Sequence, residues 1–220
     1  MQVLALSDRV LERIYSPDIR QRYPDVELLV GCGDLPYYFL EFMISIFNVP
    51  LIYVLGNHDF VPQHASDGQI RTGVQGGLNL HGKATLVEGL LCAGIQGSMR
   101  YKNQPSLMYT EQEMRWEVMR IVPRLLLAQW RHQRRLDLLV CHSPPFGIHD
   151  EQDIAHTGFR VFLPLLRYFK PRYMLHGHVH KSGRSVPFRT EYHNTTVINI
   201  FPYRLLEIEA SAFKSVEEFE

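Results

Sequence analysis

Five short apolar runs most constrain the fold of this chain, because each is too short for a typical helix and ends at polar or turn-forming residues. They are QVLALS, VELLVGC, PLIYVLG, LDLLVC and RYMLHG, at residues 2–7, 26–32, 50–56, 136–141 and 172–177. Runs of this length, rich in Val, Leu and Ile, predict buried strands. Helical patterns lie between them, and this alternation indicates βα units, so we expect an α/β fold.

Two helices are predicted with particular clarity. Thr110-Glu111-Gln112-Glu113 is a capping box that predicts a helix ending near Arg131, with a kink or a break at Pro123. LPYYFLEFMISIF, at residues 35–47, is apolar nearly all round, and its 13 residues are too few to span a bilayer. We expect this second helix to be buried in the core, and contact with a second copy in a homodimer stays the alternative.

Two other segments predict hairpins. In residues 78–96, Gly82-Lys83 and Glu88-Gly89 separate short strand-like pieces, which indicates consecutive hairpins. Residues 185–209 repeat this style, with a turn at His193-Asn194.

The composition limits the class of protein and its partners. Lys and Arg together number 23, as do Asp and Glu, so no bulk charge favours nucleic acid or a membrane as partner. The three cysteines, Cys32, Cys92 and Cys141, do not form a disulfide framework, which favours a reducing compartment, and we expect a cytoplasmic protein. No linker or repeat interrupts the chain, so we expect a single domain over residues 1–220.

The residues that follow the five predicted strands carry the chemistry. In α/β sheets, loops from several strands converge beyond the carboxyl ends of those strands, and ligands bind there. One such residue alone would be a helix cap or a core histidine, but five runs that all end in carboxylates, imidazoles or an amide predict a site for transition metals, with enough ligands for two ions. The residues are Asp8, Asp34, Asn57, His58, Asp59, His142, His178 and His180.

The order of these motifs, an Asp, then GD, GNHD, a lone His and GHVH, resembles the calcineurin-like metallophosphoesterase superfamily. The resemblance runs from Asp8 to His180 and implies a four-layer α-β-β-α sandwich of two mixed sheets flanked by helices, with the metal site at the carboxyl ends of the strands. It also implies two divalent ions, of which Mn, Fe or Zn are the candidates, and hydrolysis of a phosphomonoester or phosphodiester by metal-bound hydroxide.

The resemblance assigns a role to each motif residue. Asp34 would bridge the two metals, and His58 would contact phosphate and protonate the leaving oxygen while Asp59 orients its ring. The remaining ligands divide between the ions, with Asn57, His142 and His178 at one metal and Asp8 and His180 at the other.

One position departs from the family pattern. Val10 stands where the family generally places a histidine, so the metal at Asp8 and His180 would have one protein ligand fewer and bind more weakly. Three further residues are candidates for contact with substrate. Arg9 and Arg100 could bind phosphate, and the alternative is that both are solvated surface arginines. His156 is a candidate residue beside the pocket.

Three functions compete on this evidence. The leading hypothesis is a phosphoesterase acting on a small substrate, because a scaffold has no need of the His58-Asp59 pair. The alternative is a binding scaffold with weak or vestigial metals, which Val10 favours. Cleavage of nucleic acid is the weakest hypothesis, because the net charge is zero and basic residues cluster only in residues 131–135.

Overall fold

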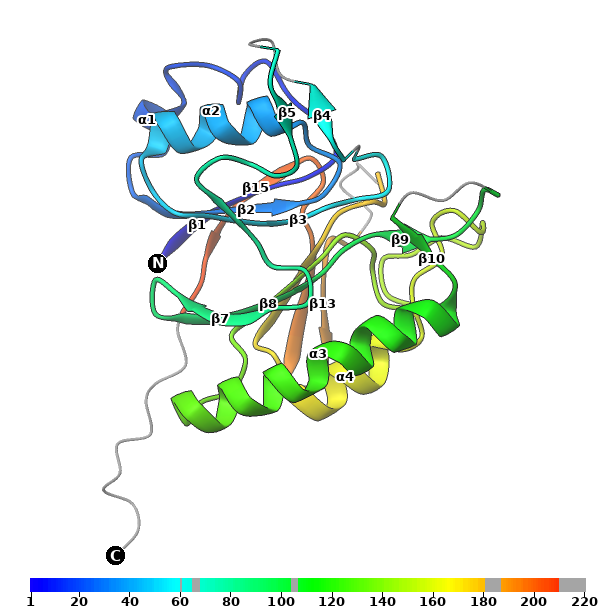
Figure 1. Ribbon diagram of the computed structural model, residues 1–220. Helices are drawn as coiled ribbons and strands as arrows, with labels where there is room; N and C mark the ends of the chain where they lie inside the picture. Colours follow the sequence, from blue (N-terminus) through cyan, green and yellow to red (C-terminus); the bar gives the residue numbers. More distant parts are fainter. Residues whose placement is uncertain (60, 65–67, 104–106, 181–186, 210–220) are drawn as a thin grey trace, which may run out of the picture.

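Two β-sheets packed face to face form the centre of the protein, and helices cover both outer faces (Figure 1). The computed structural model describes residues 1–59, 61–64, 68–103, 107–180 and 187–209. Side chains from both sheets meet between them, and among these Val30, Val140 and Leu175 are fully buried. The predicted α/β class and the four-layer α-β-β-α arrangement with two mixed sheets are confirmed.

The first sheet has five strands, ordered β15-β1-β2-β3-β6. Strands β1, β2, β3 and β6 run parallel, whereas β15 pairs with β1 in the antiparallel sense. The bounds are β15 (Tyr203–Glu207), β1 (Gln2–Leu6), β2 (Val26–Cys32), β3 (Leu51–Val54) and β6 (Gly77–Asn79).

The second sheet has six strands, ordered β13-β14-β12-β11-β8-β7, and its two outer strands are antiparallel to their neighbours. The bounds are β13 (Arg189–Tyr192), β14 (Thr195–Asn199), β12 (Tyr173–His176), β11 (Leu138–Cys141), β8 (Leu90–Ile95) and β7 (Ala84–Val87). Two small ribbons complete the strands: β4 (Gln63–His64) with β5 (Ile70–Arg71), and β9 (Ser98–Met99) with β10 (Met108–Tyr109).

All five predicted strands are present, as β1, β2, β3, β11 and β12. Their carboxyl ends converge on one edge of the sandwich, where the chemistry-bearing residues follow.

Helices α1 (Ile19–Arg22) and α2 (Tyr37–Phe47) cover the first sheet, and α3 (Glu111–His132) and α4 (Phe162–Phe169) cover the second (Figure 1). The apolar segment 35–47 forms α2, whose inner side chains, Phe39 and Met43 among them, are buried against the sheet as expected. The described residues contain no helix that combines the length and hydropathy needed to cross a bilayer.

Helix α3 begins as the capping box predicts. The Glu113 N–H donates to Thr110 Oγ1 at 3.2 Å, and the Thr110 N–H donates to a Glu113 carboxylate oxygen at 2.7 Å. Of the kink or break predicted at Pro123, the break is wrong, because the helix continues to His132. Pro123 lies on the exposed side of α3, where water can satisfy the carbonyl that loses its N–H donor.

One of the two hairpins predicted in residues 78–96 is wrong. Glu88-Gly89 joins β7 to β8 in a two-residue turn with both φ angles positive, as this turn requires. Gly82-Lys83, by contrast, lies between β6 of the first sheet and β7 of the second, so the chain changes sheets there. The turn at His193-Asn194 joins β13 to β14 as predicted.

Candidate metal centre

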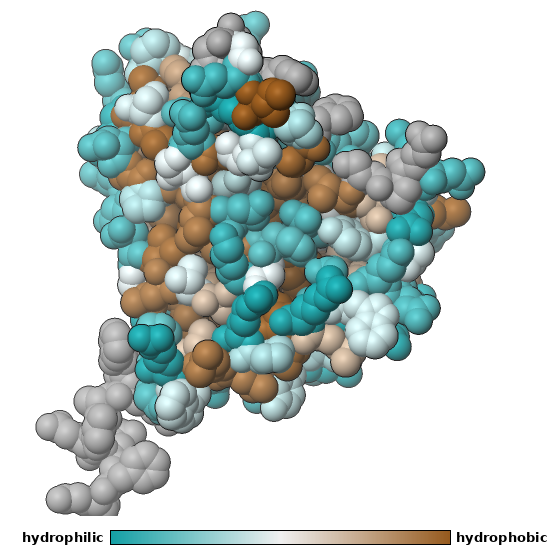
Figure 2. Space-filling view, in the orientation of Figure 1, coloured by the Kyte–Doolittle hydropathy of each residue, from teal (hydrophilic) through white to brown (hydrophobic). Residues whose placement is uncertain are grey.

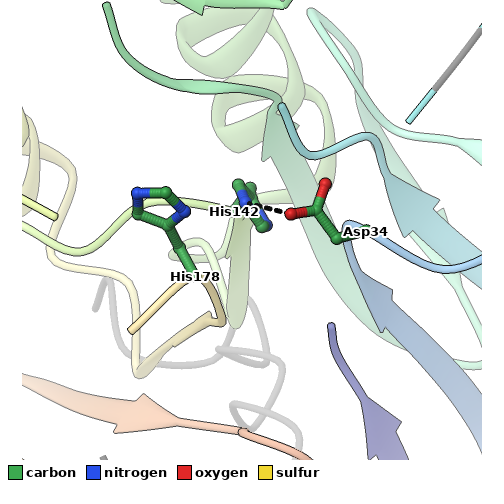
Figure 3. A group of neighbouring side chains, drawn as sticks. All are labelled: Asp34, His142 and His178. Atoms are coloured by element: carbon green, nitrogen blue, oxygen red, sulfur yellow. Dashed lines mark ion pairs between the residues drawn. The ribbon is translucent and has the colours of Figure 1, made fainter. Parts of the chain in front are cut away.

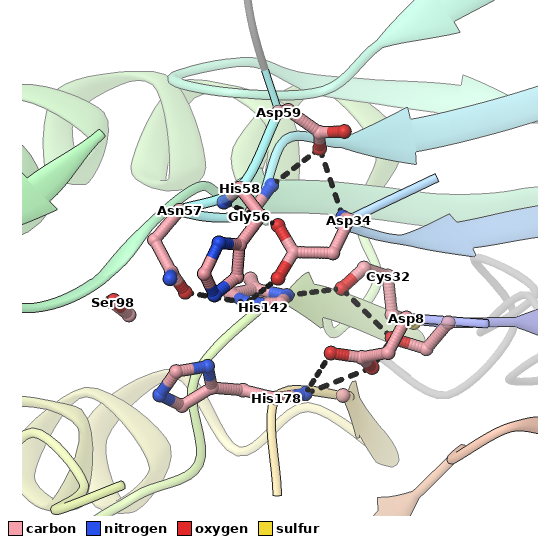
Figure 4. A network of polar contacts seen from close by, with 12 residues as sticks. Asp8, Cys32, Asp34, Gly56, Asn57, His58, Asp59, Ser98, His142 and His178 are labelled. Atoms are coloured by element: carbon pink, nitrogen blue, oxygen red, sulfur yellow. Dashed lines mark hydrogen bonds and ion pairs between the residues drawn. The ribbon is translucent and has the colours of Figure 1, made fainter. Parts of the chain in front are cut away.

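The eight predicted site residues come from both sheets. Asp8, Asp34 and Asn57 follow β1, β2 and β3 of the first sheet, whereas His142 and His178 follow β11 and β12 of the second. Figure 4 shows these side chains facing one another across the gap between the two sheets. The site therefore straddles the seam of the sandwich.

His142 lies at the centre of one group of donors. Its ring is fully buried, and its Nδ1 lies 2.8 Å from the Cys32 carbonyl oxygen. Its Nε2 lies 3.1 Å from Asn57 Oδ1 and 3.3 Å from Asp34 Oδ2 (Figure 4). Because the carbonyl oxygen can only accept, it holds the proton on Nδ1 and leaves Nε2 directed at the carboxylate and amide oxygens.

His178 completes this group from the second sheet (Figure 3). Its Nε2 lies 2.6 Å from the Ala155 carbonyl oxygen, so the Nδ1 atom is left as the potential ligand. One ligand atom each from Asp34, His142 and His178 lie within 4.8 Å of one another. A carbonyl that fixes one ring nitrogen while the other points into the site is the usual arrangement of metal-binding histidines.

Asp8 and His180 form a second, adjacent pair. The Asp8 carboxylate is 1% exposed and lies 3.1 Å from His180 Nε2. It also accepts the Ser7 hydroxyl and the backbone N–H of His178, at 3.0 and 3.1 Å to its two oxygens. The His180 ring stacks on Phe201 with ring centroids 4.4 Å apart.

Three of these residues have left-handed backbone, which Asp, Asn and His tolerate better than most residues. The φ angles of Asp8, Asp34 and His178 are 62°, 55° and 67°. Space is equally restricted at Gly56, where a Cβ would overlap the Asp34 carboxylate and lie 2.7 Å from His142 Cε1. The glycine of the GNHD motif is therefore needed for close packing of the ligands.

Charge is tightly balanced between Asp34 and His142. Burial raises the pKa of Asp34, but the His142 ring and the backbone N–H of His58 outweigh it and lower the pKa to about 2. Burial likewise lowers the pKa of His142, yet Asp34, Asp8 and the Cys32 carbonyl raise it to about 9. The surroundings of His142 thus favour the protonated, positively charged form of its ring.

His178 behaves differently, because burial and the adjacent His142 lower its pKa to about 4. The imidazole is therefore neutral at pH 7, which is the form that binds metals.

The structure does not bear out the expected interaction between His58 and Asp59. Asp59 Oδ2 accepts the N–H groups of Gly56 at 2.7 Å and Asp34 at 2.9 Å. In the described part of the chain no hydrogen bond joins its carboxylate to the His58 ring, which is exposed. Asp59 therefore positions the backbone that carries Asp34, and burial raises its own pKa to about 7.

Arg100, expected as a phosphate ligand, is paired with an acidic side chain in this structure. Its guanidinium forms two bonds with the Glu113 carboxylate, at 2.7 and 2.8 Å, at the start of α3. The Glu113 carboxylate thus offsets the charge of this guanidinium. Arg9 is exposed beside Asp8, and Val10 is half-buried and packs against the hydrophobic core of the first sheet.

His156 lies beside the site, with its ring centroid 5.3 Å from that of His178. Its Nδ1 lies 3.0 Å from both oxygens of Asp153, so this carboxylate fixes the ring. His156 thus stands next to the residues that surround the site and makes no hydrogen bond to the predicted ligands in the described chain.

Sequence patterns did not identify two supporting residues. Tyr101 accepts a hydrogen bond from Asn57 Nδ2 at 3.3 Å and so turns the amide oxygen toward His142. Ser7 holds Asp8 from the end of the strand. Both are common residue types with no motif spacing, and their place next to the GNHD loop and the first strand end was the only available signal.

The donor set fits divalent transition metals. Imidazole, carboxylate and amide oxygen are ligands of Mn, Fe and Zn, and two groups of such donors lie side by side. The residues that could hold the ions are Asp8, Asp34, Asn57, His142, His178 and His180.

Comparisons with known proteins agree with this architecture. A family model described as calcineurin-like phosphoesterase matches residues 9–182. No curated protein matches the chain significantly.

Three solved structures are similar. TT1561 of Thermus thermophilus is 17% identical, with 90% of this chain and 88% of that chain covered and a TM-score of 0.58. A single mutant of Vps29 from Entamoeba histolytica is 15% identical (96% and 88% covered, TM-score 0.42). Calcineurin-like phosphoesterase YfkN from Bacillus subtilis is 12% identical (96% and 90% covered, TM-score 0.43). At such identities the first of these likenesses shows the fold, and the other two add no argument.

Proposed function

The chain belongs to the calcineurin-like phosphoesterase family, and from this premise we propose that it is a metal-dependent hydrolase of a phosphomonoester or a phosphodiester. The observation that supports the proposal best is the pair of carbonyl-anchored histidines. His142 and His178 each have one nitrogen fixed by a backbone carbonyl and the other left for the site that contains Asp34. A core histidine needs no such convergence on a buried carboxylate.

We assign the ligands to two ions. Asp34, whose Oδ2 lies 3.3 Å from His142 Nε2, would bridge them, and a shared carboxylate offsets the repulsion between two nearby cations. Such ions, when bound, polarise the phosphoryl group and lower the pKa of a water molecule from 15.7 towards about 7. Asn57, His142 and His178 would bind one ion, and Asp8 and His180 the other.

The remaining residues act on the substrate. His58 is exposed at the rim, where its ring can reach a phosphate and donate a proton to the leaving oxygen. Arg9, exposed beside Asp8, is placed to bind a phosphate oxygen. His156, whose ring lies next to that of His178, would contact the substrate at this side of the site.

A scaffold function is the second candidate, and Val10 is the observation that favours it. The half-buried Val10 side chain packs against the core of the first sheet, and its aliphatic group cannot bind metal. The site at Asp8 and His180 is thus the weaker of the two, and a scaffold would tolerate its loss.

Metal stoichiometry and turnover together test the proposal. Purified protein is titrated with Mn, Fe(II) and Zn, and hydrolysis of p-nitrophenyl phosphate and bis-p-nitrophenyl phosphate is then followed. We expect two ions per chain and activity that His142→Asn abolishes, whereas His193→Asn, in an exposed hairpin turn, leaves activity unchanged. Absence of binding at millimolar concentrations of these metals would refute the proposed enzyme function and favour the scaffold function.

A further inference from the structure

Helix α3 has two apolar faces, and only one of them packs against the sheet. The inner face contains Met114, Val118, Ile121, Leu125 and Ala128, all buried. The outer face, on the opposite side at about 100° per residue, carries a second apolar stripe. Its members are between 44% and 71% exposed: Trp116, Met119, Leu126, Leu127 and Trp130.

Arginines, and no acidic residues, flank this outer stripe from Met119 onward. Residues 118–136 include five arginines and no Asp or Glu. Four of them are exposed: Arg120, Arg124, Arg131 and Arg135. Figure 2 shows hydrophilic and hydrophobic side chains interleaved over the lower part of the molecule, where Figure 1 places α3.

The acidic residues of α3 lie in its first two turns and are engaged. Glu111 accepts the N–H groups of Arg160 and Val161, at 3.0 and 2.8 Å. Glu113 pairs with Arg100, and Glu117 pairs with Arg120 at 2.7 Å. The C-terminal two thirds of the helix therefore present a net positive surface.

A groove of about 460 Å³ runs beside the stripe, between α3 and the edge strand β7. Four basic side chains line it: Lys83, Arg124, Arg131 and His132. Its apolar lining residues include Leu127, which also belongs to the outer stripe. None of the described residues that line the groove is acidic. The groove is thus suited to an anionic group attached to an apolar body.

We propose that the outer face of α3 docks on an anionic membrane surface, with a lipid phosphate headgroup in the groove. Tryptophan favours the membrane–water interface, and Trp116 and Trp130 lie about 21 Å apart along one side of the helix. The aliphatic side chains between them would enter the acyl boundary while the arginines bind headgroups.

Other partners fit this surface less well. A second copy of the chain would bring two rows of arginines together, which like-charge repulsion disfavours. A nucleic acid would leave Met119, Leu126 and Leu127 without apolar contacts. The proposal also revises the expectation of no membrane partner, since the balanced net charge of the whole chain conceals this local surface.

Vesicle sedimentation of the full chain tests the proposal. Vesicles of phosphatidylcholine alone are compared with vesicles that contain an equal share of phosphatidylglycerol. We expect binding only to the anionic vesicles, and a loss of about tenfold or more in partitioning for Arg124→Gln/Arg131→Gln. Leu127→Ala/Trp130→Ala should weaken binding similarly, because it removes the apolar contact.

Matched controls separate this surface from general electrostatic attraction. Arg13→Gln/Arg22→Gln removes two exposed charges near α1, and Tyr38→Ala removes an exposed aromatic ring from α2. Both should bind like the unchanged protein. In a Trp116→Phe background, the emission of Trp130 should also shift to shorter wavelength on anionic vesicles.

Three results would overturn the proposal. The first is no binding of the unchanged protein to anionic vesicles, or undiminished binding by α3 variants that circular dichroism shows to be folded. The second is an equal loss of binding in the controls. The third is self-association in gel filtration that only the α3 variants abolish, which would identify a second copy as the partner.

Discussion

Replacing Asp34 by Asn should remove a pH dependence from the stability of the metal-free protein. Although burial opposes it, Asp34 is the main group that raises the pKa of His142 to about 9. A histidine in an unfolded chain titrates near pH 6.5. Between pH 7 and pH 9 the folded protein therefore keeps a proton that the unfolded chain has lost, so stability must fall as the pH rises. Asn also tolerates the left-handed backbone at this position.

The expected size follows from the two pKa values of His142. Its protonation stabilises the fold fully below the unfolded pKa, and about 2 kcal/mol of this is lost between pH 7 and pH 9. For a chain of 220 residues this corresponds to a fall in Tm of about 4 to 8 °C. In Asp34→Asn, burial should return the His142 ring to its neutral form and remove this fall.

Thermal melts in EDTA at several pH values measure the effect. Burial raises the thiol pKa of Cys32, Cys92 and Cys141, which adds its own loss of stability above about pH 8.5. That loss is common to both proteins, so the difference between their curves reports the groups whose pKa Asp34 raises, chiefly His142 and, to a smaller extent, Asp59 and His180. Parallel curves for the two proteins would refute the reasoning. Saturating Mn should abolish the fall in the unchanged protein, because deprotonated ligands bind metal.

Three more substitutions have defined outcomes. Tyr101→Phe frees the Asn57 amide and should raise the Kd for Mn about tenfold in calorimetric titrations, with the fold unchanged. Val10→His should tighten the weaker of two Mn-binding steps in the same titration, and an unchanged second step would show that this position does not face the ion. Arg134→Ala leaves the buried Asp137 carboxylate without its 2.7 Å partner and should cost about 3 to 5 kcal/mol in urea unfolding; a loss under about 1 kcal/mol would contradict this.

Local signals in the sequence were sufficient for most of the fold. The apolar run 26–32 gives β2 with the same bounds, because a strand buried on both faces needs continuous apolar residues. The capping box at Thr110 fixes the start of α3 through contacts only three residues apart. The hairpin predicted at Gly82-Lys83 was wrong because turn residues report only the local backbone. They do not show which strands pair, and here β6 pairs with β3 and β7 with β8.

The candidate site could likewise be predicted from the sequence only in part. The ligand types and their places after strands could be predicted, because parallel strands bring their carboxyl ends to one edge. The partners of individual side chains could not. Arg100 meets Glu113, thirteen residues away, and Asp59 meets backbone N–H groups of two loops. Such contacts depend on how loops pack, and no sequence spacing records them.

The position of the metal centre across the seam gives it a mechanical consequence. Asp8, Asp34 and Asn57 belong to loops of one sheet, and His142, His178 and His180 to loops of the other. Ions bound to both sets would act as a cross-link between the two sheets and would oppose their separation at this edge. A bound ion stabilises only the closed sandwich, so chelation should increase the rate at which the sheets part. Hydrogen exchange of β2 and β11, which contact each other across the two sheets, would then accelerate before that of α2 or α4.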